Sequence, residues 1–165
     1  MKVRKRRRRE AKTDYAKRIK LLKSNSPRIV FRKTNKYLIA QYIVSKEAQD
    51  EIKLGTNSKE LLKFGWPKEF SGSLKSISAA YLLGLLISKK IKEEGLGKPI
   101  VDFGMIKMIH KTKTYAFLKG LKDSGLDINC NDKFFPDESR LKGEHMKNKI
   151  PFEEIKSKIE KIDEK

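Results

Sequence analysis

The pattern of apolar and polar positions between residues 27 and 44 predicts two strands joined by a tight turn. Residues 29–32 and 37–44 are rich in the β-branched and aromatic side chains that suit a pleated surface. Three polar residues, 34–36, separate the two runs. Because asparagine tolerates a positive φ, we expect Asn35 to be the pivot of the turn.

Side chains alternate between the two faces of a strand, and this alternation predicts which residues of the first strand share a face. Arg28 and Arg32 are expected on one face with Val30. Ile29 and Phe31 are expected on the opposite face. The hairpin is therefore predicted to carry a basic, hydrogen-bonding rim at its tip.

Residues 74–93 predict the strongest helix of the chain, because they are apolar on most sides. Ser73 or Ser76 is placed to cap its start, and Gly95 is placed to end it. Residues 99–103 then predict a short buried strand. A strand that follows a crossover helix is typical of parallel pairing, so we expect a parallel neighbour for this strand.

The remaining pattern predicts shorter elements. We expect a short helix after a cap at Thr13 or Asp14, with Tyr15, Ile19 and Leu22 on one face. Further along, the pattern predicts a loop at 45–50, a strand at 51–54, a capped helical turn at Ser58, a core position at Trp66, a helix at 114–123, a closing strand at 126–128 and a terminal helix at 151–162. The apolar stripe of the terminal helix fits either its own domain or a neighbouring protein.

The order of these elements predicts an α/β fold. We expect a three-layer α/β/α domain with a mixed sheet. The sheet should be antiparallel at its start and parallel where a helix crosses over.

Positive charge is concentrated at the N-terminal end of the chain. The 165 residues carry a formal net charge of +19, and residues 1–36, with 16 Lys and Arg against 2 Asp and Glu, account for +14 of it. Such an excess indicates a polyanionic partner, first nucleic acid and second an anionic membrane surface. The like charges of residues 1–12 repel one another, so this segment is expected to be disordered when nothing is bound to it. We interpret them as an arm that orders on phosphates, the alternative being a solvated tail or a localisation signal.

Catalytic and metal-binding patterns are weak. Cys130 is the only cysteine, and His110 and His145 are 35 residues apart without further ligands beside them. Residues 102–104 read Asp-Phe-Gly, but the glycine-rich loop, strand lysine and catalytic-loop aspartate of a kinase do not accompany them. Only Asp102 is placed for a two-metal nuclease. We therefore expect no enzyme, no metal site, no cofactor and no small-molecule substrate.

The sequence also indicates the compartment. No apolar run approaches the length of a membrane span, and no apolar segment follows the basic N-terminus as it would in a secretory signal. A single cysteine suits a reducing environment. We expect a cytoplasmic protein without membrane contact.

Five blocks of sequence resemble a known family in their order and spacing. They are TDYAKRIKLLKSNSPRIVFRKTNKYLIAQ (residues 13–41), NSKELLKFGW (57–66), AAYLLGLLISKK (79–90), YAFLKGLKDSGLDI (115–128) and FPDESRLKGEHM (135–146). Over most of its length the chain is similar to the archaeal form of large-subunit ribosomal protein eighteen. This is a 5S rRNA-binding family whose eukaryotic member is called ribosomal protein five of the large subunit.

The resemblance implies a ribonuclease H-like outline without the catalytic acids, and a structural role in the large ribosomal subunit. It implies that the protein seats 5S rRNA in the central protuberance and attaches it to large-subunit rRNA. Residues 135–146 should lie against rRNA and neighbouring large-subunit proteins. The chain then divides into a basic arm (1–12), an α/β RNA-binding domain (13–128) and a C-terminal extension with a terminal helix (129–165).

The resemblance also implies which residues contact 5S rRNA. Carried over by position, they are Arg4, Lys5, Arg6, Arg7, Arg8, Arg9, Lys12, Tyr15, Arg18, Arg28, Arg32, Lys33, Asn35, Lys36, Tyr37 and Gln41. Strand packing is the alternative for the tyrosine and glutamine of the hairpin, and a solvated edge is the alternative for its basic residues. The alternative functions are an RNA-processing nuclease, a generic RNA-binding assembly factor of similar fold, and a peripheral protein of anionic membranes.

Overall fold

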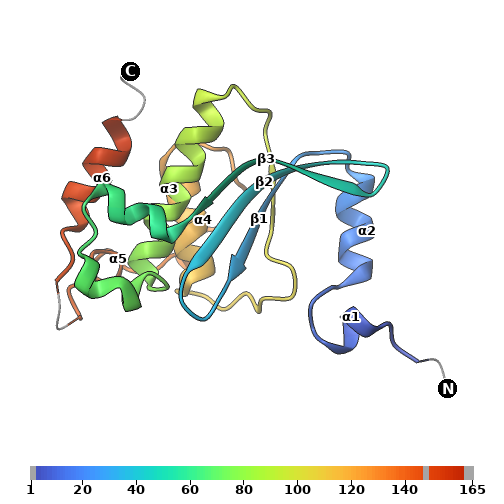
Figure 1. Ribbon diagram of the computed structural model, residues 1–165, viewed down its shortest axis with the longest axis horizontal. Helices are drawn as coiled ribbons and strands as arrows, with labels where there is room; N and C mark the ends of the chain where they lie inside the picture. Colours follow the sequence, from blue (N-terminus) through green and yellow to red (C-terminus); the bar gives the residue numbers. More distant parts are fainter. Residues whose placement is uncertain (1–2, 147–148, 162–165) are drawn as a thin grey trace.

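A four-stranded mixed sheet forms the middle layer of the protein (Figure 1). The computed structural model describes residues 3–146 and 149–161. The strands are ordered β3-β2-β1-β4 and comprise β1 (Arg28–Lys33), β2 (Leu38–Lys46), β3 (Gln49–Asn57) and β4 (Ile100–Asp102). β2 is antiparallel to both β1 and β3, whereas β4 is parallel to β1. The predicted mixed sheet and the parallel pairing after the crossover helix are confirmed.

Helices lie on both faces of this sheet, which confirms the three-layer arrangement (Figure 1). α3 (Ile77–Glu93) and α4 (Lys113–Asp123) cover one face, and α2 (Tyr15–Lys23) lies against the other. α6 (Phe152–Glu160) packs outside α3. The shorter elements are α1 (Arg6–Arg9), η1 (Ser58–Phe64), η2 (Lys68–Ser73), η3 (Asp132–Phe134) and α5 (Glu138–Lys142).

The main core lies between the sheet and α3 with α4. Ile29 and Phe31 of β1 point into it, as the alternation predicted, and the Phe31 ring centroid lies 4.5 Å from that of Phe117 in α4. Ser76 caps α3 by accepting a hydrogen bond from the Ala79 amide. The apolar sequence of α3 is explained by this position, because the helix contacts the sheet, α4 and α6.

α3 and α4 cross at two glycines. A Cβ placed on Gly84 would lie 2.5 Å from the Phe117 carbonyl oxygen, and one placed on Gly120 would lie 2.2 Å from the Tyr81 carbonyl oxygen. The helix backbones are therefore in direct contact there, and no side chain fits between them.

The C-terminal extension shares this core. Phe152 and Ile155 of α6 are buried, and the Phe152 ring lies 5.6 Å from Tyr81 of α3. The apolar stripe of the terminal helix thus packs on its own chain. Ile162, which the sequence also placed on that stripe, lies outside the described residues.

The structure corrects the predicted loop at residues 45–50. β2 continues to Lys46 and β3 starts at Gln49, so only Glu47 and Ala48 form the turn, with φ of 48° and 65°. Two consecutive positive φ angles are typical of a tight hairpin turn, which usually contains Asn and Gly. Glu-Ala gave no such signal, and the polar strand ends resembled a loop.

Two further expectations are wrong. Asn35 does not adopt a positive φ, because Thr34 closes the β1–β2 turn: its Oγ1 accepts from the Tyr37 amide (3.0 Å) and donates to the Tyr37 carbonyl (2.6 Å). The described residues 126–128 form no strand. They follow the turn that ends α4, and the Leu126 amide donates to the Leu121 carbonyl of that helix.

The glycine contact predicts the sign of a stability change. Alanine favours a helix interior over glycine by about 1 kcal/mol, so Gly120→Ala would stabilise an unhindered helix. We expect instead that it lowers the free energy of unfolding by about 1–3 kcal/mol, because the added methyl group pushes α3 and α4 apart. Urea unfolding measures this. Gly72→Ala is the matched control, since a Cβ there meets nothing within 4 Å, and a stabilised Gly120→Ala protein would contradict the contact.

Candidate nucleic-acid interface

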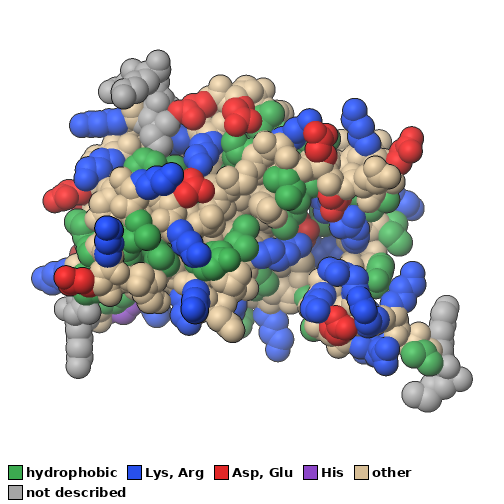
Figure 2. Space-filling view, in the orientation of Figure 1, with side chains coloured by type: hydrophobic (Ala, Val, Ile, Leu, Met, Phe, Trp, Pro, Cys, Tyr) green, Lys and Arg blue, Asp and Glu red, His purple; other side chains and the backbone are tan. Residues whose placement is uncertain are grey.

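Basic side chains gather around the N-terminal arm. Figure 2 shows a dense group of Lys and Arg side chains over α1, at the end of the molecule where the N-terminus lies. The predicted arm residues Arg4, Lys5, Arg6, Arg7, Arg9 and Lys12 are exposed and Arg8 is half-buried. The Lys5 ammonium lies 4.7 Å from the ring centroid of Tyr15.

The arm is ordered by contacts at the start of α2. Arg7 Nε donates to Thr13 Oγ1 (2.9 Å), and Arg8 Nη1 lies 3.2 Å from Asp14 Oδ2. Asp14 caps α2 by accepting from the Lys17 amide, and this bond, with Arg8 beside it, lowers the pKa of the Asp14 carboxyl. Of the two predicted caps, Asp14 is therefore the one used. The described arm contains the helical turn α1 rather than only disordered chain, because these neighbours offset its self-repulsion.

A polar hollow of about 120 Å³ lies where the arm, α2 and the sheet meet. We call it the arm hollow. The side chains that line it come from segments far apart in sequence, and five of them are basic. The lining residues are Arg7, Lys12, Thr13, Asp14, Lys17, Arg18, Leu21, Arg32, Asp102 and Gly104. Four predicted contact residues, Arg7, Lys12, Arg18 and Arg32, are thus brought together.

Sequence reasoning did not place the other residues of the arm hollow there, among them Lys17 and Gly104. Lys17 lies one turn from Leu21 on the same face of α2, and this spacing was the signal that the sequence offered for its position. Its Nζ donates to the Gly104 carbonyl at 3.4 Å. Gly104 has a φ of +60°, and a Cβ there would lie 3.1 Å from Cζ of Arg32. The absence of a side chain at Gly104 lets the Arg32 guanidinium lie flat against the backbone.

A buried network of charges lies beside the arm hollow. Arg28 Nη2 donates to Asp50 Oδ1 and to Ser45 Oγ, both at 2.8 Å, and its Nη1 lies 3.7 Å from Asp102 Oδ2. Asp50 Oδ2 also accepts from Arg18 Nη1 of α2 at 3.0 Å. The network therefore ties α2 to the sheet.

Arg32 joins the same network through Asp102. Its Nη2 donates to Asp102 Oδ2 (3.1 Å) and its Nη1 donates to the Asp102 carbonyl (2.9 Å). The Arg32 side chain remains 41% exposed, whereas that of Arg28 is only 2% exposed. The prediction that Arg28 belongs to the basic rim is therefore wrong. Arg28 lies at the buried start of β1, away from the turn, and its burial is possible because two carboxylates there compensate its charge.

The hairpin tip carries the other predicted contacts. Lys33, Asn35 and Lys36 are exposed, while the half-buried Tyr37 ring lies under the Lys59 ammonium, 4.5 Å from it. Gln41 is half-buried in the middle of β2, opposite Val30. The tip and the arm hollow are separate patches that meet at the end of β1, where Arg32 and Lys33 are consecutive.

Three observations bear on other chemistries. In residues 3–146 and 149–161, no three His, Cys, Asp or Glu side chains are grouped as metal ligands. No helix in the same ranges has the length and hydropathy of a membrane span. The Asp102 carboxylate, the expected nuclease candidate, is held by Arg28, Arg32 and the Gly104 amide, which donates to Oδ1 at 2.7 Å.

Comparison with known proteins shows which family the sequence is similar to. A family model described as "Ribosomal large subunit proteins 60S L5, and 50S L18" matches residues 1–97. The chain is 46% identical to large ribosomal subunit protein uL18 of Korarchaeum cryptofilum over 145 residues, 88% of this chain and 72% of the relative. It is 41% identical to uL18 of Methanoculleus marisnigri over 88% of this chain and 81% of the relative. It is 44% identical to uL18 of Methanosphaera stadtmanae over 88% of this chain and 73% of the relative.

The buried network predicts how stability depends on pH. Burial alone would raise the pKa of Asp50, but hydrogen bonds from Ser45 and Arg18 and the charge of Arg28 hold it below the usual 3.8. A carboxyl with a lowered folded pKa adds stability above its unfolded pKa, and this is lost as the pH falls through the lower folded value. We expect Asp50→Asn to be less stable than wild type at pH 6 and to lose stability less steeply below about pH 4.

Urea unfolding at a series of pH values measures both effects. Asp137→Asn is the control, because its pair with Lys111 (3.1 Å) is exposed. It should change stability by no more than about 0.5 kcal/mol at pH 6 and leave the acid profile unaltered. Identical acid profiles for wild type and Asp50→Asn would show that the network does not hold this carboxylate.

Proposed function

Because the chain belongs to the family of ribosomal large-subunit proteins that comprises 60S L5 and 50S L18, we propose that it binds 5S rRNA and helps attach it to large-subunit rRNA in the central protuberance. The family is one of structural ribosomal components rather than enzymes. In this proposal the protein works in the cytoplasm, within the large subunit, beside neighbouring ribosomal proteins.

The arm hollow is the observation that carries the RNA-binding proposal. Five cationic side chains converge on it, and its volume of about 120 Å³ suits a single phosphate group rather than a larger ligand. Guanidinium groups bind phosphate oxygens through paired hydrogen bonds. Because Asp102 holds the Arg32 guanidinium in place, little side-chain entropy remains to be lost when a phosphate binds.

The hairpin tip supplies groups of a different kind. Phosphate contacts fix position but carry little sequence information. RNA is recognised instead through its shape, its 2′-hydroxyls and its unpaired bases. The exposed amide of Asn35 and the ring of Tyr37 suit such recognition, with Lys33 and Lys36 beside them for the backbone.

The set of direct contacts that we propose is the one that the resemblance implies, without the buried Arg28. It comprises Arg4, Lys5, Arg6, Arg7, Arg8, Arg9, Lys12, Tyr15, Arg18, Arg32, Lys33, Asn35, Lys36, Tyr37 and Gln41, with Lys17 added. Arg28 is assigned an indirect role in this proposal, because it orients the carboxylates that hold Arg18 and Arg32.

The salt dependence of RNA binding tests this proposal. Purified protein is titrated with 5S rRNA and with an unrelated structured RNA of equal length across a salt series. We expect 5S rRNA to stay preferred as salt rises, because recognition of shape is screened less than phosphate contacts are. If both RNAs weaken together along one slope, the chain acts as a generic polycation and the 5S assignment fails.

Variants locate the contacts within the same titration. Arg7→Ala with Lys12→Ala should lower the slope of log affinity against log salt by up to about 0.7–0.9, the value for the one phosphate that the arm hollow holds. The control is Lys63→Ala with Lys68→Ala, which removes equal charge from exposed positions of η1 and η2. Equal slopes for the two double variants would rule out the arm hollow as a phosphate site.

A further inference from the structure

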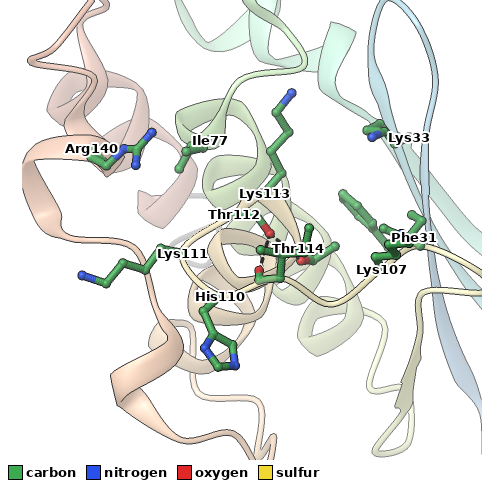
Figure 3. Close-up of a pocket in the computed structure, with 12 residues that line it drawn as sticks. Phe31, Lys33, Ile77, Lys107, His110, Lys111, Thr112, Lys113, Thr114 and Arg140 are labelled. Atoms are coloured by element: carbon green, nitrogen blue, oxygen red, sulfur yellow. Dashed lines mark hydrogen bonds between the residues drawn. The ribbon is translucent and has the colours of Figure 1, made fainter.

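A second hollow opens on the other side of β1 and has no role in the function proposed above. It has a volume of about 640 Å³, within the usual range for small-molecule sites. The end of β1, the segment 106–112, the starts of α3 and α4, and α5 surround it (Figure 3). We call it the lysine cavity.

The lysine cavity combines an apolar floor with a cationic rim. Phe31, Ile77, Ile106 and Ile109 form the apolar part. Five basic side chains stand around it: Lys33, Lys107, Lys111, Lys113 and Arg140. None of the described residues that line it is acidic. Figure 3 shows the labelled basic side chains spread around the opening rather than paired with one another.

Only part of this positive charge is offset by the protein, since Lys111 pairs with Asp137 (3.1 Å), a residue that does not line the cavity. Burial lowers the pKa of Lys113, and the neighbouring charges of Lys33 and Lys75 lower it further. Lys113 is also the first residue of α4, and no side chain caps that helix. The partial positive charge of the helix start therefore adds to that of the lysines. An anion in the cavity would be stabilised by both.

The apolar part of this surface continues outside the cavity. Ile109, which lines the cavity, is 59% exposed, and its neighbour Met108, which does not line it, is 41% exposed. Both belong to the irregular segment between β4 and α4. Methionine and isoleucine side chains offer flat apolar contact for a nucleobase. A bare phosphate would not need these side chains, but a nucleotide uses both parts of the site.

The lysine cavity is joined to the arm hollow by that same segment. Arg8 Nη1 of the arm lies 3.8 Å from Met105 Sδ, and Gly104 lines the arm hollow while Ile106 lines the lysine cavity. The end of β1 connects the two sites as well, because Arg32 lines the arm hollow and the next residue, Lys33, lines the lysine cavity. The residues that line the two sites are therefore neighbours in the chain, and an RNA already bound at the arm hollow is favoured over a separate acidic protein segment as the occupant of the cavity.

We propose that the lysine cavity binds an unpaired nucleotide of rRNA, with its base on Ile77, Ile106 and Ile109 and its phosphate between Lys107 and Lys113. This inference rests on the proposed rRNA-binding function, but it names a second site with its own ligand. Duplex RNA does not fit it, because paired bases are not free to leave the stack and enter the cavity.

The proposal is tested by methyl NMR of the full-length protein with labelled isoleucines. A single-stranded RNA oligonucleotide, and the same oligonucleotide annealed to its complement, are titrated separately. We expect the single strand to shift the methyl signals of Ile77, Ile106 and Ile109, while the duplex leaves them in place. Ile155 of α6 is fully buried elsewhere and serves as the internal reference.

Charge variants complete the test. Lys107→Ala with Lys113→Ala should abolish the isoleucine shifts and lower the salt slope for the single strand by about 0.7, the value for the one phosphate held between them. Lys63→Ala with Lys68→Ala should leave both unchanged. Equal shifts with duplex and single strand, or shifts produced by poly-glutamate but by neither RNA, would overturn the proposal, the latter in favour of an acidic protein partner.

This result is separable from the test of the proposed function. If 5S rRNA is preferred and the arm variants weaken it, while the isoleucine signals ignore single-stranded RNA, only the lysine cavity is wrong. If the isoleucine signals respond to single-stranded RNA but 5S rRNA is not preferred, the cavity stands and the 5S assignment fails.

Discussion

The buried guanidinium of Arg28 is the contact on which the second face of the sheet depends. It lies between Asp50 of β3 and Asp102 of β4, the two edge strands, and Asp50 in turn binds Arg18 of α2. Removing one partner from a buried charge pair typically costs about 3–5 kcal/mol, because the other charge is left without compensation. Each member of the network therefore depends on the others to compensate its charge, and the network fixes where α2 lies against the sheet.

The same network explains how a chain with 40 basic and 21 acidic residues can order its cations. Asp14, Asp50 and Asp102 each contact more than one basic or backbone group, so a few carboxylates position much of the surface near the arm. A guanidinium held on one side by a carboxylate keeps its other hydrogen-bond donors available to solvent or ligand. The acidic residues of this region thus hold the basic side chains in position rather than neutralise the surface.

Sequence patterns predicted those strands and helices in which buried apolar positions recur at regular intervals along the chain. β1, β2 and α3 carry enough alternating or continuous apolar residues to be placed within a few positions. The strand ends at 45–50 could not be placed, since the polar side chains of Ser45 and Asp50 bind Arg28 of β1 and so carry no local strand signal. The site was predicted only in part for a related reason. The arm and hairpin lysines and arginines are visible as charge, but Arg28 looks like any strand arginine until Asp50 and Asp102 are known to meet it.

The end of β1 shows why register matters to the surface as much as to the core. Arg32 and Lys33 are consecutive, so the alternation of side chains sends Arg32 to the arm hollow and Lys33 to the lysine cavity. A slip of one residue would exchange them and would also bring Ile29 and Phe31 out of the core. Burial of those two side chains, at 0% and 1% exposure, therefore fixes the register that divides the positive charge between two hollows. The hydrophobic core specifies in this way which cation faces which site, although it contributes no charged group to either.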